Sequence, residues 1–272
     1  MTDPTPTTDP YADLAAGFLD HYSSTRGVVR HTLIARQIRD HLPSGTSRVA
    51  DIGGGAGAQA IELARQGCAV DLLDPSAEML DEARAKLDQE PDDVAARVQL
   101  FEATGDQATA VLEPGGYDVA MCHGVLMYLD RSEPVVDELV QLVRPGGLVS
   151  VVTKNQHSLA MRAGLRGDWT KALGLFDADR TVGNLGAVTR GDTIEELTAT
   201  LEASGAPVEA WYGIRVFTDH LPDEPAADDL SELIAAEWEA GRRDPYRGVA
   251  PLLHVLARRR PGTSGLLADQ PT

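Results

Sequence analysis

The sequence predicts an α/β fold built on a mostly parallel sheet, and three features of its pattern lead to this prediction. Short apolar segments typical of buried strands alternate with segments whose apolar residues recur at helical spacing. The first strand, near 48–52, runs directly into the glycine-rich turn Gly53–Gly57, and the second, near 69–73, ends at Asp74. Such sheets bind ligands at the carboxyl ends of their strands, so we expect the site at the edge that carries this turn and this acid.

The region before the first strand is expected to be helical. Residues 1–10 are rich in Thr and Pro and are predicted to be a disordered tail. Over 11–45 apolar residues fall on one helical face, both before and after a Ser-Ser-Thr break at 23–25. Two helices in this position often cover a nucleotide site, so 11–45 is predicted to form a lid.

The core, residues 46–153, alternates strands with helices, which calls for parallel strands joined by right-handed crossovers. Each expected strand is a short apolar run, and each expected helix carries apolar residues three and four positions apart. The expected strands are 48–52, 69–73, 97–101, 117–122 and 148–153. The expected helices are 57–66, 76–88 and 134–143. Leu142–Gly147 then combines a helix end, a turn and a strand start.

Beyond residue 153 the pattern loosens. Residues 154–206 contain helical stretches and the glycine-rich loop Gly183–Gly186, and they are longer than an ordinary connection, so we expect an insertion that carries substrate contacts. Residues 207–260 contain expected strands at 207–219 and 252–257 around a helix, which would complete a seven-stranded sheet with an antiparallel C-terminal strand. Residues 261–272 are predicted to be a second disordered tail.

The glycine-rich turn and the acid after the second strand point to a nucleotide-like ligand. Gly53, Gly54 and Gly55 lack a Cβ, so a ligand can approach main-chain N–H groups at the N-terminus of the following helix. Asp74 stands at the spacing at which α/β nucleotide folds place a carboxylate on ribose hydroxyls. Asp51, on the strand that leads into the turn, belongs to the same predicted cofactor site. The turn also fits the dinucleotide fingerprint, so these residues leave both a dinucleotide and S-adenosylmethionine (SAM) open.

Two later strands bring further polar residues to the same edge. The third delivers Thr104, Gly105 and Asp106, and the Asp106 carboxylate could read an adenine amino group. Its alternative role is the N-cap of a short helix at 108–112. The fourth strand delivers His123 to the expected substrate entrance, and the alternative for His123 is a hydrogen-bonded structural histidine.

The composition narrows the classes of function. The formal net charge of -18 argues against non-specific attraction to nucleic acid or anionic membranes. Residues 51–149 alone carry a formal net charge of -13. The basic groups therefore concentrate outside the core, where a substrate would bind. No apolar run reaches the roughly 18 residues of a membrane span and no signal peptide is evident, so we expect a cytoplasmic protein. We also expect a monomer or weak homodimer. Cys68 and Cys122 fit neither zinc spacing nor a disulfide framework; we expect two buried thiols and no metal site.

Three stretches together resemble class I SAM-dependent methyltransferases: Val49–Gly57, Asp74–Ser76 with Met79–Leu80, and Leu142–Gly147. This resemblance implies a Rossmann-like seven-stranded sheet and SAM as the cofactor. A closer likeness covers nearly the whole chain and is to the CmoM (SmtA-type) subfamily, whose best-described members methylate the carboxylate of 5-carboxymethoxyuridine at the tRNA wobble position. The residues that carry it are Phe18, Tyr22, Arg30, Asn155, Met161, Gly167, Gly213–Phe217, Asp219, Pro245–Tyr246, His254–Val255 and Ala257–Arg258.

The resemblance implies roles for single positions. In the cofactor site these are Arg30 at the methionine carboxylate, Gly53 and Gly54 under the sulfonium moiety, Asp74 at the ribose, Thr104 and Gly105 at the adenine, and His123 near the methyl donor. Acceptor contacts are expected from Tyr22, Arg26, Arg215 and Tyr246, although Tyr22 and Arg26 could equally pack within the protein. The candidates for a basic patch are Arg162, Arg166, Lys171, Arg215, Arg242, Arg243 and Arg247, with scattered solvated arginines as the alternative.

One departure from the subfamily keeps a second acceptor open. The subfamily commonly carries a Gly-Arg-Tyr triplet where this chain has Ala250–Pro251–Leu252. Together with the negative charge, this leaves a small secondary metabolite as an alternative to tRNA. An NAD-dependent enzyme that uses Asp74 is disfavoured by the paired terminal strands, and a catalytically silent scaffold is disfavoured by the intact glycine turn.

The acceptor decides which catalytic groups are needed. The methyl group of SAM is already activated, so positioning the nucleophile supplies most of the rate, about 7 to 11 kcal/mol at best. A carboxylate with an ordinary pKa of about 4 is ionised at neutral pH and needs no base. We therefore expect base-free O-methylation of a carboxylate; a hydroxyl acceptor would need a base, for which His123 is the candidate.

Overall fold

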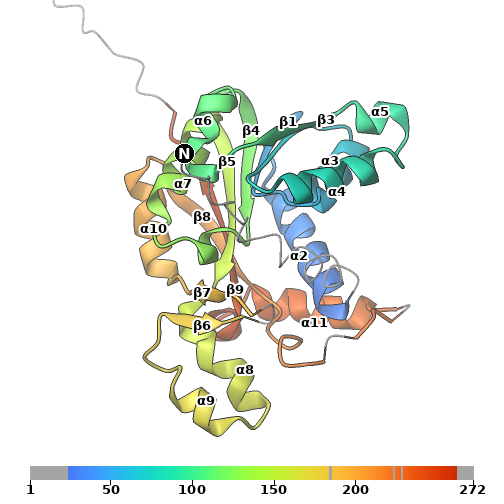
Figure 1. Ribbon diagram of the computed structural model, residues 1–272. Coiled ribbons are helices and arrows are strands. Elements are labelled where there is room, and N and C mark those ends of the chain that lie inside the picture. Colours follow the sequence, from blue (N-terminus) through green and yellow to red (C-terminus); the bar gives the residue numbers. More distant parts are fainter. Residues whose placement is uncertain (1–23, 184–185, 223, 228, 262–272) are drawn as a thin grey trace, which may run out of the picture.

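The computed structural model describes residues 24–183, 186–222, 224–227 and 229–261 and shows an α/β sandwich (Figure 1). Seven strands form one sheet in the order β3-β2-β1-β4-β5-β9-β8. Their bounds are β1 Arg48–Ile52, β2 Ala69–Asp74, β3 Val98–Glu102, β4 Tyr117–His123, β5 Val143–Lys154, β8 Val208–Ile214 and β9 Leu252–Arg258. β1 to β5 pair in parallel, and β9 runs antiparallel to both of its neighbours, as the sequence predicted.

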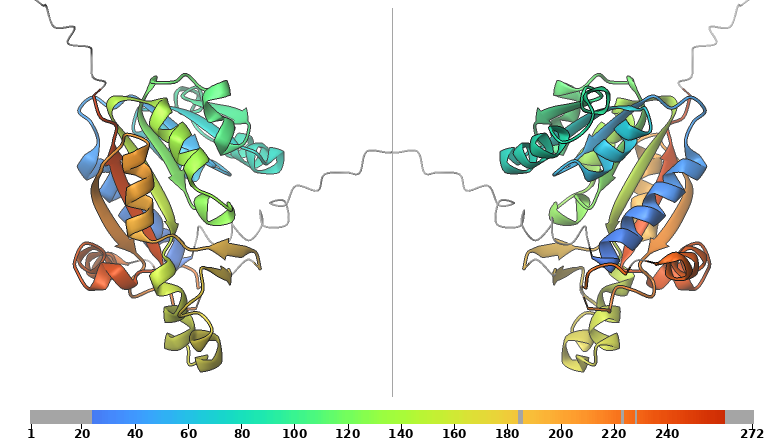
Figure 2. Two further views of the ribbon diagram at one scale, coloured as in Figure 1. Left: turned by 90° about the vertical axis from the view of Figure 1, so that its left-hand side faces the viewer. Right: turned by 90° about the vertical axis from the view of Figure 1, so that its right-hand side faces the viewer.

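Helices cover both faces of the sheet, and Figure 2 shows α2 on one face and α7 with α10 on the other. The first face carries α2 Thr25–His41, α3 Ala58–Arg65, α4 Ala77–Leu87 and α11 Ser231–Gly241. The second face carries α6 Ala108–Val111, α7 Glu133–Leu142 and α10 Ile194–Ala203. Shorter elements are α5 Asp92–Ala95 and the 3-10 turns η1 Gly105–Gln107, η2 Leu126–Tyr128, η3 Gln156–Ser158 and η4 Tyr246–Val249. Each face therefore buries its own apolar cluster against the sheet.

The helix α2 belongs to the core. Val29, Leu33 and Ile34 are fully buried and pack with side chains of the sheet. Arg258 on β9 donates from Nη2 to the carbonyl of His41 at 2.9 Å, which fixes the end of the helix. The first predicted lid helix and Tyr22 lie outside the described residues, as do both predicted tails apart from Pro261. The second half of the predicted lid is thus a packed layer of the fold, and its action as a lid stays a prediction.

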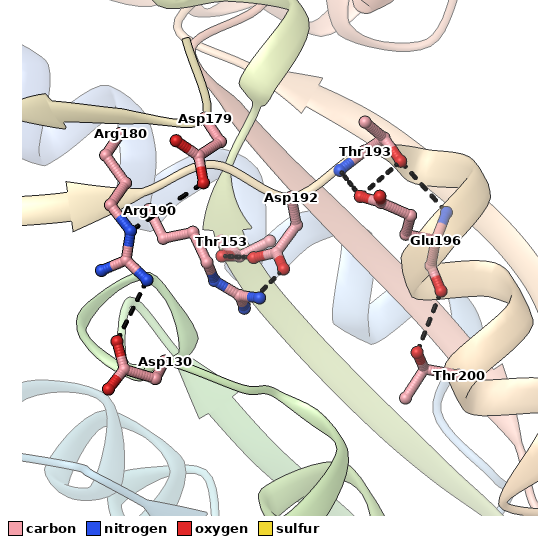
Figure 3. Close-up of polar contacts among 9 residues, drawn as sticks. All are labelled: Asp130, Thr153, Asp179, Arg180, Arg190, Asp192, Thr193, Glu196 and Thr200. Atoms are coloured by element: carbon pink, nitrogen blue, oxygen red, sulfur yellow. Dashed lines mark hydrogen bonds and ion pairs between the residues drawn. The ribbon is translucent and has the colours of Figure 1, made fainter.

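The expected insertion, 154–206, is only partly a separate lobe: the segment up to residue 190 extends from the end of β5, whereas its last helix, α10, packs on the sheet (Figures 1 and 2). It contains the predicted helices, α8 Leu159–Leu165 and α9 Trp169–Leu173, and also a hairpin that the sequence did not reveal, β6 Arg180–Val182 with β7 Val188–Arg190. Figure 3 shows how its base is held: the buried carboxylate of Asp192 accepts from Thr153 on β5 at 2.6 Å and from Arg190 at 2.7 Å. The base of the lobe is therefore tied directly to the sheet edge.

The predicted strand 207–219 is too long. β8 ends at Ile214, and Arg215 has a φ of 66°, which takes the chain out of the extended conformation. The buried carboxylate of Glu237 on α11 then accepts from the N–H groups of Val216, Phe217 and Thr218 at 2.7, 3.0 and 2.9 Å. A side chain distant in sequence therefore takes the hydrogen bonds that a strand partner would have taken.

Within the ranges that the structure describes, none of the helices is both long and apolar enough to cross a membrane.

Candidate functional site

The glycine turn after β1 forms a cradle that excludes side chains. Gly53 and Gly55 have φ values of 72° and 55°, which disfavour any residue with a Cβ. At Gly54 an added Cβ would lie 2.7 Å from Cγ of Leu72 and 2.8 Å from Oδ2 of Asp51. The N–H groups of Gly53 and Gly54 donate to the carbonyl of Leu73 at 2.7 and 3.3 Å, and that of Gly55 donates to Asp74, so these three groups hold the turn together and are not the open donors that the sequence predicted. Among the described residues no side chain caps α3, which begins just after the turn.

Asp74 is held in place at the end of β2. Its Oδ2 accepts from the N–H of Gly55 at 2.8 Å, and its Oδ1 accepts from the N–H of Ser76 at 2.9 Å. These two main-chain bonds fix the carboxylate beside the glycine turn, at the position where the sequence predicted a ribose contact.

Asp51 is a buried carboxylate with an unsatisfied oxygen. It is 2% exposed, and its Oδ2 has no hydrogen-bond partner in the described part of the chain. Burial, together with the negative charge of Asp74, raises the pKa of Asp51 to about 7. A cationic group bound beside Gly54 would stabilise the ionised carboxylate.

His123 and Arg30 meet at the end of β4. Arg30, on α2, donates from Nη2 to the carbonyl of His123 at 3.2 Å, and its buried Nε lacks a partner among the described residues. The imidazole is hydrogen bonded at both nitrogens, Nδ1 to Oε1 of Gln59 at 2.7 Å and Nε2 to Oγ of Ser150 at 2.8 Å. Burial, and then the proximity of His254 and Arg30, holds the pKa of His123 well below its ordinary value. His123 is therefore neutral at physiological pH.

Thr104, Gly105 and Asp106 form the turn that follows β3. A Cβ at Gly105 would lie 3.1 Å from Ile52 and 3.3 Å from Val135, so this position also requires close packing. The alternative role of Asp106 was wrong: the N-cap of α6 is Gln107, and Asp106 itself lies exposed in η1. The 3-10 turn places its carboxylate before the cap position, free to face a ligand.

A cavity of about 450 Å³ lies where the insertion meets the carboxyl edge of the sheet. We call it the basic pocket, because five of its lining residues are cationic and two are acidic. They are Lys154, Arg162, Arg166, Lys171 and Arg215, with Asp168 and Asp219. Lys154 ends β5, and burial followed by the charges of Arg215 and Arg162, partly offset by Asp219, lowers its pKa to about 8.

Asp219 organises the cations around this pocket. Its Oδ1 lies 3.0 Å from Nη2 of Arg215 and 3.8 Å from Nη1 of Arg162. The buried Arg26 donates from Nη1 to the main-chain carbonyl of Asp219 at 3.3 Å. Arg30, which donates to the carbonyl of His123, also repels the positive charge of Arg215. Its charge therefore acts both at the end of β4 and in the basic pocket.

Known proteins resemble the chain in the same region. Residues 50–149 match the family described as a methyltransferase domain. The chain carries a methyltransferase domain. It is also 29% identical over 256 residues to tRNA 5-carboxymethoxyuridine methyltransferase of Escherichia coli O157:H7, an alignment that covers 92% of this chain and 95% of that protein. Ubiquinone biosynthesis O-methyltransferase of Burkholderia thailandensis is 34% identical over 117 residues, covering 43% of this chain and 47% of that protein.

The fold of this methyltransferase has solved counterparts. A SAM-dependent methyltransferase from Mesorhizobium loti superposes with a TM-score of 0.55 at 20% identity, covering 85% of this chain and 100% of that one. The predicted fold class is thereby confirmed. The domain match and the likeness to the Escherichia coli enzyme over 92% of this chain confirm the enzyme class, a SAM-dependent methyltransferase.

The methyltransferase offers SAM chemically matched groups. The ammonium of its methionine part suits the unsatisfied Oδ2 of Asp51, and its carboxylate suits the unpartnered Nε of Arg30. The ribose hydroxyls suit the carboxylate of Asp74, which is held at the end of β2 beside the glycine turn. The glycine cradle has no room for side chains, which fits a ligand lying against the backbone. The residues present thus fit the cofactor.

Not every predicted acceptor residue lines the pocket. Arg215 lines it and Arg26 contacts its rim, whereas Tyr246 is 51% exposed and packs edge-on against Phe217. Three members of the predicted basic patch do not line it either, and each of them pairs with an acidic neighbour. These pairs are Arg242 and Arg243 with Glu239, and Arg247 with Asp244.

The sequence reading missed Lys154, Ser150 and Gln59. Lys154 could have been found, because it follows the fifth expected strand as His123 follows the fourth. Gln59 and Ser150 carried no such signal, since a glutamine in a helix and a serine in an apolar strand have many structural roles. Their proximity to His123 is a product of the tertiary fold.

Proposed function

We propose that this methyltransferase O-methylates a carboxylate on an anionic acceptor that binds in the basic pocket. The observation that carries the proposal is the clustering of Lys154, Arg162 and Arg215 in one cavity at the carboxyl edge of the sheet. A pKa of about 8 leaves Lys154 mainly protonated at pH 7, so it can pair with an anion. The similarity to tRNA 5-carboxymethoxyuridine methyltransferase supports a carboxymethoxy group as that acceptor.

When bound, SAM supplies an activated methyl group, and the chain supplies position and charge. In the proposal the cofactor is held by Arg30, Asp51, Gly53–Gly55, Asp74 and Thr104–Asp106. The cations of the basic pocket orient the acceptor carboxylate, which is ionised at neutral pH and needs no proton removed. Orientation of this kind is worth about 7 to 11 kcal/mol at best.

The state of His123 supports the base-free course. A general base needs an accessible lone pair, but both ring nitrogens already have protein partners at 2.7 and 2.8 Å. Its lowered pKa also makes it a weak proton acceptor. We therefore assign His123 to shaping the site beside the methyl donor. Comparing the pH–rate profiles of the wild type and His123→Ala tests this. The assignment would be contradicted if the wild type showed the pH dependence of a general base near neutrality, and the variant lost that dependence together with several orders of magnitude in rate.

The missing subfamily arginine has a structural counterpart. Pro251 and Leu252, within the segment that replaces the Gly-Arg-Tyr triplet, line the basic pocket. Lys154, Arg162 and Arg215 line the same cavity from β5, α8 and the loop after β8. Positive charge is thus supplied to the cavity from other elements, which keeps an anionic acceptor compatible with this chain.

tRNA is the first candidate acceptor, and it has a direct test. Mass spectrometry of tRNA hydrolysates from a strain with and without the gene should show a methyl ester on wobble 5-carboxymethoxyuridine only when the gene is present. Restoring the gene with Lys154→Met should leave the ester low, whereas Arg242→Leu, at an exposed pair with Glu239, should restore it. Equal methyl ester with and without the gene would exclude tRNA.

A small anionic metabolite is the second candidate. The net charge of -18 disfavours a polyanionic partner, and a cavity of about 450 Å³ has the size of a small-molecule site. Purified enzyme with radiolabelled SAM, incubated separately with bulk tRNA and with a small-molecule extract, separates the two candidates. Label in the small-molecule fraction alone would make a small metabolite the proposed acceptor in place of tRNA.

A further inference from the structure

A continuous chain of buried hydrogen bonds crosses the sheet behind the site. Gln59 Oε1 lies 2.7 Å from Nδ1 of His123, whose Nε2 lies 2.8 Å from Oγ of Ser150. The same Oγ lies 2.8 Å from Nε2 of His254, whose Nδ1 lies 2.6 Å from Oε1 of Gln37. We call these five residues the relay. Ser150, His254 and Gln37 are fully inaccessible to solvent.

The relay is built by the sheet register. His123 on β4 pairs with Val152 on β5, and Val152 pairs with His254 on β9, so both imidazoles point to one face. Ser150 is two residues from Val152 and points to that face as well. Gln59 on α3 and Gln37 on α2 close the chain from the helices that cover it. The two rings are 5.6 Å apart and packed edge to face.

The proton count of the relay requires one of the two glutamine amides to be turned. With both glutamines presenting Oε1, both rings would carry their proton on Nδ1, and the single hydroxyl proton of Ser150 could satisfy only one of the two Nε2 atoms. Nε2 of Gln37 has no partner among the described residues, so a turned amide lets it donate to Nδ1 of His254. Every bond then has one donor and one acceptor: His254 donates from Nε2 to Ser150, Ser150 donates to Nε2 of His123, and His123 donates from Nδ1 to Gln59.

Both rings are neutral in this arrangement. Burial comes first among the causes that lower the pKa of His254 to about 3 and that of His123 well below normal. The charged and titratable groups acting on His123 are His254 on β9 and Arg30 and His31 on α2. All three would oppose a positive charge on the ring.

We propose that Ser150 and His254 are positioning residues for methyl transfer, which fix the tautomer and ring orientation of His123 from beneath the sheet edge. This inference rests on the proposed function in one respect, that His123 borders the methyl donor. His254 reaches the site only through Ser150 and His123, yet it determines which nitrogen of His123 carries the proton. A displacement of about 1 Å in a positioned group can cost 100-fold in rate, so a residue this remote can control turnover.

The first test is nitrogen NMR of the wild-type protein labelled at histidine. We expect His123 protonated at Nδ1 and His254 protonated at Nε2, with assignments from His123→Gln and His254→Gln. The opposite pair of tautomers, or titration of either ring between about pH 6 and pH 8, would overturn the relay. This measurement requires no active-site variant to fold.

The second test removes the central hydroxyl. Ser150→Ala should lower kcat by ~10-fold to ~100-fold, while the Kd for S-adenosylhomocysteine changes less than about threefold. The Nε2 signal of His123 in the nitrogen NMR spectrum should also shift in Ser150→Ala, because this atom loses its hydrogen-bond partner. The matched control is Leu148→Val, which removes buried atoms from the same face and strand at a position that pairs with Val119 and Arg258 and with no member of the relay.

The outcomes separate this inference from the proposed function. Failure of the wild-type protein to bind S-adenosylhomocysteine in calorimetry would reject the function itself. An active wild type whose Ser150→Ala variant keeps both its kcat and the Nε2 signal of His123 would reject the relay and leave the function standing. Equal losses of kcat in Ser150→Ala and Leu148→Val would likewise assign Ser150 to packing alone.

Discussion

We predict that Asp51 makes the affinity of this methyltransferase for its cofactor depend on pH. Burial and the nearby carboxylate of Asp74 raise the pKa of Asp51 to about 7 in the free protein. The carboxylate has an unsatisfied oxygen beside the glycine cradle, so a bound ammonium group would favour its ionised form. Ligand binding should therefore release a proton, and the perturbations that test this are pH and Asp51→Asn.

The size of the effect follows from the two pKa values. If the pKa of Asp51 falls below about 5 in the complex, the ionised fraction that binds rises from about a tenth at pH 6 to about nine tenths at pH 8. The Kd for S-adenosylhomocysteine should then be about tenfold weaker at pH 6 than at pH 8, a difference of about 1.4 kcal/mol. At pH 7 calorimetry in two buffers of different ionisation enthalpy should detect about half a proton released per ligand.

The variant Asp51→Asn supplies the control and a second prediction, on stability. Asp51→Asn should bind more weakly at pH 8 and lose the pH dependence between pH 6 and pH 8. Because the pKa is raised on folding, the free wild-type protein loses stability as pH rises from about 4 through about 7, by up to about 4 kcal/mol. Asp51→Asn should therefore raise Tm at pH 8. A wild-type Kd that is flat from pH 6 to pH 8, with no proton release, would refute this reasoning.

Three further predictions concern the cradle, the pocket and the loop after β8. Gly54→Ala should abolish binding of S-adenosylhomocysteine in calorimetry and destabilise the fold by about 1 to 3 kcal/mol, whereas Gly248→Ala, where a Cβ meets no described atom within 4 Å, should do neither. Lys154→Met should raise the acceptor KM at least ~10-fold with an unchanged Kd for S-adenosylhomocysteine, and Arg242→Leu should change neither; an unchanged KM would remove Lys154 from the site. Glu237→Gln should lower the free energy of unfolding in urea by about 1 to 3 kcal/mol. An amide cannot accept both the three main-chain bonds and the fourth bond, from the hydroxyl of Thr218; equal stability would contradict the role of Glu237 in anchoring the loop after β8.

Local pattern was sufficient for the elements that carry the cofactor edge. β1, the turn Gly53–Gly57 and β2 with Asp74 were predicted within a residue or two, since a buried parallel strand, a glycine requirement and a terminal acid are all written in adjacent residues. Local pattern gave a wrong prediction at 215–219. The apolar residues there suggested a strand, but the carboxylate of Glu237, distant in sequence, accepts hydrogen bonds from the main chain instead.

By itself the sequence determined the alternation of strands and helices, a nucleotide-like ligand and the residues at the strand ends, because each is recorded in residues that are adjacent along the chain. The resemblance to known methyltransferases then favoured SAM over a dinucleotide. The tertiary structure alone decided which cations share a cavity and what state His123 adopts. Lys154 and Arg215 are 61 positions apart, and Gln37 and His254 are 217 apart. Strand order and register bring such residues together, and burial then sets their charge, so no local pattern records either result.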